Sequence, residues 1–212
     1  MTEEEKQYYQ AQQTKFNSLH NIEQDCWERI SRGALSSRDD FHQPVVATIS
    51  GDMSSLRTVV LRNAWSQDKK VAFHTDTRSG KIHDIALNNN ISWLFYSQRH
   101  RVQIRLGGKA EIQKNTPFAE ESWQKALGKS VKCYVGETAP GTISLEATSG
   151  LPEKYANREP TRTESKEAIN NFAVVVTQVM WMEWLWLNSR GHLRAQFVYN
   201  GDNTFKSNWL VP

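Results

Sequence analysis

The chain has 212 residues, a formal net charge of +3 at pH 7 and a hydrophobic content of 38% that includes eight Trp and eight Phe. This length and composition suit one soluble domain with a buried core. No apolar run is long enough to span a bilayer, so a membrane protein is not expected. The two cysteines, Cys26 and Cys133, lack a second Cys or His at metal-ligand spacing and cannot form a disulfide framework, so no metal site is expected.

The distribution of charge along the chain bears on its expected cellular location and on the ligands it could bind. The N-terminal stretch MTEEEKQYYQAQQTK is polar and acidic, unlike a secretory signal or a transit peptide, which favours a cytoplasmic location. Further along, residues 57–105 hold nine Lys or Arg against three Asp. Such a positive surface attracts a phosphate ligand, a nucleic acid or an anionic substrate about equally well.

The first expected element is an amphipathic helix. Residues recur on one face at three- and four-residue steps from Phe16 to Ile30, and Gly33 is placed to end the helix. We expect this helix to cover one side of a sheet or barrel. A strand is then expected over 45–50, before a turn at Gly51.

Four further segments have the β-branched and aromatic content of strands, and two of the gaps between them are short enough for hairpins. They are residues 56–64, 70–75, 91–98 and 101–113. Between the second and the third, Ile82 and Ile85 share one helical face, which predicts an inserted helix. Four or five antiparallel strands with one inserted helix predict a small barrel, so the expected class is mostly β with flanking helices.

The second half of the chain is less regular. A helix is expected over 116–127, capped by its first Thr, and the Gly- and Pro-rich segment 128–165 is expected to be loop with a turn of helix. The apolar segment 172–187 alternates large side chains on two faces, which predicts a strand covered on both. A hairpin turn over 188–191 leads into two last strands, separated by a turn at 201–203.

No repeat or linker divides the chain, so a single domain over residues 1–212 is predicted. The positive segment 57–105 falls within its core strands. The expected parts are a helical cover over 1–35, core barrel strands over 40–112, a helix and loop over 116–165 and C-terminal strands over 170–212.

Residues 55–81 gather three kinds of phosphate-binding group. One strand is expected to carry Arg57 and Arg62, a second strand ends at Thr75, and the loop 76–81 opens a helix. Long cations, hydroxyls and the N–H groups of a helix N-terminus are what a bound phosphomonoester needs. The stretch therefore predicts a site for the phosphate of a cofactor.

The same residues carry a family resemblance. The chain resembles the pyridoxamine 5'-phosphate oxidase-like flavoproteins in four pieces: Arg57-Thr-Val-Val-Leu-Arg62, Phe73-His-Thr-Asp76, Arg78-Ser-Gly-Lys81 and Gln103-Ile-Arg-Leu-Gly-Gly-Lys-Ala-Glu111. It looks most like a divergent FMN-binding group rather than the oxidase proper. The resemblance is good over residues 40–112 and loose over the C-terminal strands. The resemblance implies an FMN-binding split β-barrel of antiparallel Greek-key type, and a homodimer with FMN at the subunit interface and a small-molecule substrate.

The resemblance also implies which residues contact FMN. The phosphate, a dianion that needs at least two cations or helix-end amides, would be held by two gripping cations, a third cation and two hydroxyl donors: Arg57, Lys81, Arg78, Ser79 and Thr75. The isoalloxazine ring would lie over the backbone of Thr58, Val59, Val60 and Leu61, with Arg62 near its reactive side. Gln103 would hydrogen-bond the flavin, and Phe172 stands where the family has a ring-contacting Trp. His74, beside Thr75, is counted with the cofactor site.

Two departures from the oxidase concern its substrate. The oxidase has an Arg-x-His-x-Arg run that grips the substrate and touches FMN, whereas this chain has His192-Leu-Arg194-Ala-Gln196. The segment 123–131 also does not reproduce the family's Tyr and Arg contacts to the phosphate of that substrate, and Gly80 replaces the usual Arg of the phosphate loop. The resemblance therefore argues against pyridoxamine 5'-phosphate and assigns His192 and Arg194 to another anionic substrate. No catalytic acid or base is apparent, so the catalytic residues are unassigned.

Ordinary structural roles fit several of these residues as well. Arg57 and Arg62 are five residues apart, so in a regular strand they face opposite sides, and joint contact with one flavin requires a bend, a bulge or a strand end. Gln103 fits a plain cross-strand contact. His192 and Arg194 fit the alternation of an exposed strand.

Two classes of function stay open at this point, and a third is an outsider. The first is an FMN-dependent oxidoreductase, in which the cofactor performs the difficult step. The second is a non-catalytic protein that stores or senses FMN, or binds haem, on the same barrel. The third, binding of single-stranded nucleic acid, requires exposed aromatic residues among the cations. Trp93, Phe95 and Tyr96 instead sit in an apolar run typical of a buried strand, so a nucleic-acid partner is not expected.

Overall fold

The computed structural model describes residue 16 and residues 18–126, 131–202 and 204–212. Three α-helices lie within these ranges: α2 (Leu19–Leu35), α3 (Gly80–Leu87) and α4 (Pro117–Ala126). The same ranges contain nine strands, namely β1 (Val45–Ser50), β2 (Met53–Thr58), β3 (Leu61–Trp65), β4 (Lys70–Asp76), β5 (Asn90–Ser97), β6 (Val102–Gln113), β7 (Phe172–Trp186), β8 (Leu193–Tyr199) and β9 (Phe205–Leu210). Short 3-10 turns lie between α4 and β7: η1 (Val131–Tyr134), η2 (Glu153–Tyr155) and η3 (Glu167–Asn171).

The strands form one antiparallel sheet in the order β2-β1-β5-β6-β7-β4-β3, from which β8 and β9 extend beside β7. The two end strands of this order, β2 and β3, are joined only by Val59 and Val60. Because so short a link spans only a few ångströms, the sheet has to curl until its ends approach each other. The end strands do not pair, so the barrel is open along this line.

The break between β2 and β3 corrects one expectation. Residues 56–64 were expected to form one strand, but the ladder stops at Thr58 and resumes at Leu61. In the gap, the Val59 N–H donates to the Pro44 carbonyl at 3.0 Å, outside either ladder. The composition of this stretch is strand-like throughout, so local sequence does not reveal the point at which the chain changes from one end of the sheet to the other.

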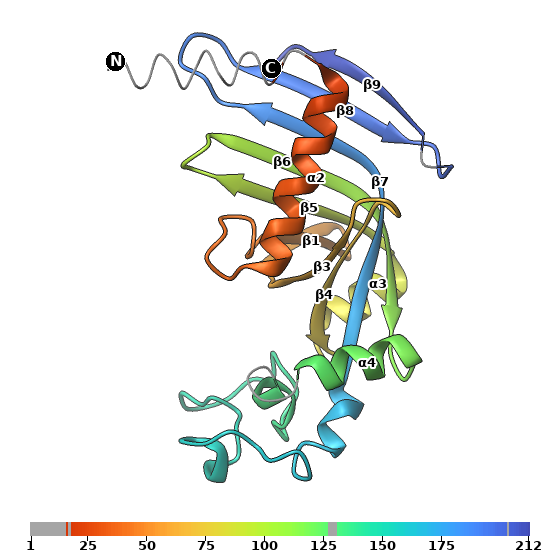
Figure 1. The fold of residues 1–212 in the computed structure, drawn as a ribbon. Coiled ribbons are helices and arrows are strands. Elements are labelled where there is room, and N and C mark those ends of the chain that lie inside the picture. Colours follow the sequence, from red (N-terminus) through yellow and green to blue (C-terminus); the bar gives the residue numbers. More distant parts are fainter. Residues whose placement is uncertain (1–15, 17, 127–130, 203) are drawn as a thin grey trace.

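Helix α2 crosses the strands and supplies one side of the core (Figure 1). Its buried residues Ile22, Cys26, Trp27 and Ile30 pack into the main hydrophobic cluster. The helix continues past Gly33 to Leu35, so the prediction that Gly33 ends it is wrong. The expected helical cover also included residues 1–15 and 17, which lie outside the described residues. None of the described helices is long and apolar enough to cross a lipid bilayer.

A second hydrophobic cluster surrounds the start of β7. Phe172 and Val174 from that strand pack there with Trp123 of α4 and Tyr134 of η1. Figure 1 shows α4 and the segment from η1 to η3 gathered around this end of the strand. The Ala119 N–H donates to the Thr116 hydroxyl at 3.2 Å, which confirms the expected cap of α4. The last residue of the expected helix, Leu127, lies outside the described residues.

The long strands β6 and β7 leave one face of the sheet only partly covered. Trp184 and Trp186 are buried on the inner face, but Trp181, Glu183 and Leu185 on the other face are half-buried. The expectation that both faces of 172–187 are covered is therefore wrong for the single chain. We call this second side, which includes Trp181, Glu183 and Leu185, the outer face. Residues that pair with these in the neighbouring strands lie on the same face, because paired residues of adjacent strands point to the same side of a sheet.

Candidate functional site

Four of the predicted phosphate contacts meet where β4 leads into α3. The Lys81 ammonium donates to the hydroxyls of Thr75 and Ser79, each at 3.1 Å. The two hydroxyl oxygens are 3.2 Å apart, and both side chains are buried. β4 ends at Asp76, and α3 begins at Gly80, so strand and helix ends place this ammonium and these hydroxyls together.

Arg57 reaches the same region from β2. Its guanidinium donates to the hydroxyls of Thr48 and Ser55, both at 2.6 Å, and lies 3.7 Å from a carboxylate oxygen of Asp84 on α3. The fully buried Thr48 hydroxyl in turn donates to Asp84 at 2.7 Å. These contacts hold Arg57 in one orientation over the first turns of α3. Thr48 and Asp84 did not emerge from sequence reasoning, because their roles depend on strand β1 packing against the helix.

The electrostatics of this cluster favour an added anion. Burial lowers the pKa of Lys81, and the nearby charge of Arg57 lowers it further, while Asp76 and Asp84 oppose the shift. Burial also lowers the pKa of Arg57, against the effect of Asp84. Two partly buried cations therefore repel each other here, and a phosphate between them would relieve that repulsion.

The start of α3 adds backbone donors to these cations. The first N–H groups of a helix have no partner within the helix and carry its positive dipole end. A Cβ on Gly80 would meet no atom within 4 Å, so a ligand can approach the backbone there. The cluster of Arg57, Thr75, Ser79 and Lys81 therefore fits the phosphate of a mononucleotide cofactor, and we call it the phosphate cluster.

Arg78, the predicted third cation, is turned away from the phosphate cluster. Its guanidinium donates to both carboxylate oxygens of Asp76, at 3.0 and 2.8 Å, and to the carbonyls of Gly136 and Glu137, at 3.0 and 3.2 Å. The same side chain lines a cavity of about 670 Å³ formed mainly by residues 132–151. Arg78 thus fastens this loop to the phosphate region.

The charge of Arg62 acts on His74, whose ring contacts Phe172. The His74 and Phe172 rings are 4.8 Å apart, and Phe172 is 1% exposed between Trp123 and Tyr134. Burial lowers the pKa of His74 to about 4, with a further contribution from the positive charge of Arg62. Phe172 has the surroundings of a core residue, and the two arginines, Arg57 and Arg62, belong to separate groups.

The predicted backbone platform for the ring is the break between β2 and β3. Thr58 is the exposed last residue of β2, and Leu61 is the fully buried first residue of β3. Val59 and Val60, both half-buried, cross between the strands. Arg57 and Arg62 could contact one flavin only if a bend, a bulge or a strand end lay between them. The end of β2 provides such a strand end.

Gln103 lies on the outer face and not in the phosphate cluster of its own chain. In the ladders it pairs with Tyr96 of β5 and Leu185 of β7, and Leu185 pairs with Arg194 of β8. These four residues therefore form one row across the face. Tyr96 is 47% exposed, so the expectation that this aromatic residue is buried with Trp93 and Phe95 is wrong for Tyr96.

The two predicted substrate contacts already have partners. Arg194 donates to the Glu183 carboxylate at 2.7 Å, and Arg105 donates to the same oxygen at 3.1 Å. The Asn188 N–H donates to the His192 ring nitrogen Nδ1 at 3.1 Å, which closes the hairpin before β8. Glu183 was missed as a site residue, although a single acid on the outward side of an apolar strand was a usable signal.

Comparison with known proteins identifies the relatives of this fold and site. Residues 24–114 match the family model for the FMN-binding domain of pyridoxamine 5'-phosphate oxidase. The pyridoxine/pyridoxamine 5'-phosphate oxidase of Psychrobacter cryohalolentis is 27% identical over 173 residues, covering 79% of this chain and 77% of that protein. The enzyme of the same name from Anaplasma phagocytophilum is also 27% identical, covering 79% and 81%.

Solved structures with this fold confirm the predicted split barrel. A pyridoxamine 5'-phosphate oxidase-related, FMN-binding protein from Nostoc punctiforme aligns over 89% of this chain and 96% of its own, with a TM-score of 0.69 and 18% identity. PhzG from Burkholderia lata, solved with tetrahydrophenazine-1-carboxylic acid, aligns over 89% and 90%, with a TM-score of 0.64 and 18% identity. At these identities the likeness concerns the fold.

Proposed function

We propose that this chain, a member of the pyridoxamine 5'-phosphate oxidase-like FMN-binding family, is an FMN-dependent oxidoreductase with an altered substrate site. The cofactor of the family domain is FMN. The observation that carries the proposal is the phosphate cluster, in which Arg57 and Lys81 lie close enough for the charge of one to lower the pKa of the other. Bound FMN supplies two-electron oxidation chemistry that side chains alone do not provide.

In this proposal the chain holds FMN by its two ends. Arg57 and Lys81, with the hydroxyls of Thr75 and Ser79, would bind the phosphate. Residues 58–61 would lie under the ring, with Arg62 near its reactive side. The support for the second part is the strand break at Val59 and Val60, which leaves the backbone half-buried beside both arginines.

We further propose a homodimer in which FMN lies at the subunit interface. Gln103, on the outer face, would contact the flavin held by the phosphate cluster of the other copy. The apolar side chains Leu94 and Tyr96 support an interface here, because they are 37% and 47% exposed on the same side of the sheet as Gln103. Exposed apolar side chains on a sheet face are typical of a surface that a partner covers.

The substrate would differ from pyridoxamine 5'-phosphate. Arg194 is paired with Glu183, and the Nδ1 atom of His192 accepts a backbone hydrogen bond, so neither is a ready phosphate ligand. A substrate phosphate would have to compete with the Glu183 carboxylate for the same guanidinium. This arrangement favours a substrate with less negative charge than a phosphate ester.

The cofactor site can be tested by removing both cations of the phosphate cluster. Arg57→Ala with Lys81→Ala is expected to raise the Kd for FMN at least about a hundredfold, because each charged hydrogen bond contributes roughly 1.5–3 kcal/mol. The quenching of flavin fluorescence on titration measures this Kd. Lys206→Ala, which removes an exposed cation from β9, is the matched control and should leave the Kd unchanged. Unchanged FMN affinity in the double variant would show that the phosphate binds elsewhere.

Catalysis needs a separate measurement. The purified protein should show the flavin absorption bands, which a candidate substrate or a nicotinamide reductant should bleach and an acceptor such as oxygen should restore. FMN that binds tightly but is never reduced by any donor in such a screen would instead indicate the non-catalytic FMN protein. A haem absorption band without flavin would contradict the proposed cofactor.

A further inference from the structure

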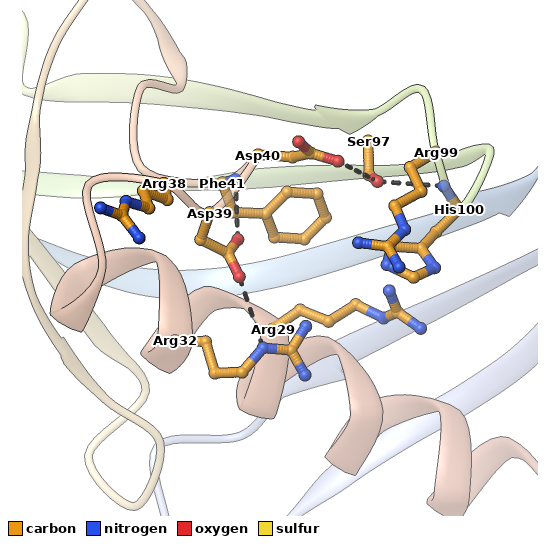
Figure 2. A pocket seen from close by; sticks show the side chains of 9 residues that line it. All are labelled: Arg29, Arg32, Arg38, Asp39, Asp40, Phe41, Ser97, Arg99 and His100. Atoms are coloured by element: carbon orange, nitrogen blue, oxygen red, sulfur yellow. Dashed lines mark hydrogen bonds and ion pairs between the residues drawn. The ribbon is translucent and has the colours of Figure 1, made fainter.

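A small polar cavity is formed by elements other than those that carry the phosphate cluster. It is enclosed by the second half of α2, by the loop 36–44 and by the turn between β5 and β6 (Figure 2). Its volume is about 90 Å³. The residues that line it are Arg29, Arg32, Arg38, Asp39, Asp40, Phe41, Ser97, Arg99 and His100.

The walls of this cavity are fixed by close contacts. The loop lies against α2 so tightly that a Cβ on Gly33 would come within 2.7 Å of the Phe41 backbone. The Ser97 hydroxyl donates to Asp40 at 2.6 Å and accepts the His100 N–H at 3.1 Å, which ties the β5–β6 turn to the loop. These contacts fix the part of the wall formed by Asp40, Ser97 and His100, whereas the arginines at positions 32, 38 and 99 are exposed at its rim.

Positive charge dominates the lining. Four arginines face two aspartates, and both aspartates are already engaged. Asp40 accepts the Ser97 hydroxyl, and Asp39 accepts the Phe41 N–H at 2.9 Å and the Arg32 Nε–H at 3.4 Å. Among the described residues, the side chain of Arg99 has no hydrogen bond or ion pair, so its charge is uncompensated by the protein there.

Arg29 is the buried member of this group. It is only 5% exposed and forms a buried ion pair with Asp25, to which its Nε–H donates at 2.6 Å. Figure 2 shows its guanidinium extending along the cavity toward Arg99 and His100. A guanidinium anchored through Nε still presents its terminal N–H groups, which are the donors suited to two oxygens of an oxyanion.

His100 responds to the positive potential of the cavity. Its pKa is lowered by burial and by the charges of Arg29, Arg99 and Arg32, with Asp40 opposing. The arginines therefore outnumber the aspartates around this imidazole, and both aspartates are engaged, which makes the lining a candidate site for an anion.

We propose that this cavity binds a small tetrahedral oxyanion, either inorganic phosphate or the terminal phosphate of a small ester. Arg29 and Arg99 would grip its oxygens, and His100 would donate a further hydrogen bond when protonated. A cavity of about 90 Å³ has room for a phosphate group and is too small to enclose a whole flavin or nucleotide. This site shares no residue with the phosphate cluster and is independent of the proposed function.

The test uses the protein with FMN bound, so that the phosphate cluster is occupied. Inorganic phosphate and glycerol 3-phosphate are titrated separately by calorimetry, with sodium chloride at matched ionic strength as the reference. Saturable binding of inorganic phosphate alone would assign the site to the free ion, and binding of the ester as well would assign it to a phosphate group in general. Heat changes that chloride reproduces, or no saturable binding, would overturn the proposal.

Variants locate the binding. Arg99→Gln, at an exposed position that the fold tolerates, is expected to weaken phosphate binding at least about tenfold, because it removes one charged donor. Arg190→Gln removes the same charge from the exposed turn before β8 and should bind phosphate as the wild type does. Equal affinity in the two variants would overturn the assignment to this cavity.

A second readout follows His100 directly. The lining charges that face its imidazole are Arg29 and Arg32 from α2, Asp39 and Asp40 with Arg38 from the loop, and Arg99 from the turn. Phosphate binding is expected to raise the pKa of His100, measured by NMR of its ring protons. A pKa of His100 that phosphate leaves unchanged, while phosphate still binds, would place the ion elsewhere on the protein.

Discussion

His74 shows how one side chain can couple the proposed cofactor region to pH. Its ring contacts Phe172, and its Nδ1 atom is buried without a hydrogen-bond partner among the described residues. Burial first and the charge of Arg62 second lower its pKa from 6.5 to about 4. The folded state therefore holds His74 neutral at pH values where the unfolded chain binds a proton.

The consequence is a loss of stability in mild acid. Because the folded pKa lies below the unfolded one, the contribution of His74 is complete above the unfolded pKa and declines as the pH falls toward the folded pKa. Between about pH 7 and about pH 4.5 the wild type should lose about 2 kcal/mol more than His74→Gln, measured by urea unfolding at both pH values. Parallel losses in the two proteins would mean that His74 titrates normally in the folded state.

Single residues also show the reach of sequence reasoning at the site. Thr75, Ser79 and Lys81 lie within seven positions of one another, so their meeting at the start of α3 follows from local spacing. The partners of Arg78 could not be predicted in the same way, because they include the carbonyls of Gly136 and Glu137, nearly sixty positions away. Contacts over such separations depend on how the loop folds back, which spacing does not encode.

The strand pair β6–β7 contains an irregularity that fixes an aromatic side chain. The register shifts between Gly107 and Gly108, and a Cβ on Gly107 would lie within the ring of Trp181, 2.2 Å from its nearest atom. Arg105 covers the same ring at 5.7 Å. The absence of a side chain at Gly107 thus lets Trp181 lie flat on the outer face.

Filling that space should destabilise the pair. Gly107→Ala is expected to lower the free energy of unfolding by about 1–3 kcal/mol, the usual cost of overpacking a close contact. Chemical denaturation measures it, and the shift in Trp fluorescence reports on Trp181. Gly80→Ala, where a Cβ meets nothing within 4 Å, is the control and should change stability by less than about 0.5 kcal/mol. If both variants unfold alike, the Trp181 ring moves aside without cost.

Elements with strong local signals were predicted well, and elements set by topology were not. Helix α3 and the cap of α4 follow from periodicity and capping chemistry. The break at Val59 and Val60 could not be predicted in this way, because valine favours a strand. The chain leaves the ladder there because β2 and β3 lie at opposite ends of the strand order. Gly33 likewise serves the approach of the loop at Phe41, and not the end of α2.

At the scale of the whole molecule, the outer face is the surface that the proposed homodimer would cover. It carries the exposed apolar side chains of Leu94 and Tyr96 beside Gln103 and the charged group of Arg105, Glu183 and Arg194. Interfaces between identical subunits are enriched in apolar and aromatic side chains and in Arg, and this face carries all three. This is the surface through which the proposed homodimer would form.

A charge on that face should separate the subunits. Leu94→Glu is expected to raise the dimer dissociation constant about a hundredfold or more, because it would bury an unpaired carboxylate at the interface. Analytical ultracentrifugation measures the constant, and FMN affinity should fall in the same variant because Gln103 of the second copy is lost. Leu35→Glu, at an 88% exposed position ending α2, should leave both unchanged. A dimeric Leu94→Glu protein would exclude this face as the interface.

The FMN cofactor and the mostly β fold could be predicted from the amino-acid sequence, because the Arg57 and Arg78–Lys81 motifs that carry the family resemblance and the strand patterns lie in order along the chain. Which of the predicted contacts meet depends on the folding of distant segments. The packing of β1 against α3 brings Arg57 close enough to Lys81 to lower its pKa. Arg62 acts instead on His74, and Phe172 is buried in a hydrophobic cluster. Tertiary structure also pairs Arg194 with Glu183 and assembles the arginine-lined cavity. These outcomes depend on contacts between distant segments, whose geometry is set by the curl of the sheet rather than by any short stretch of sequence.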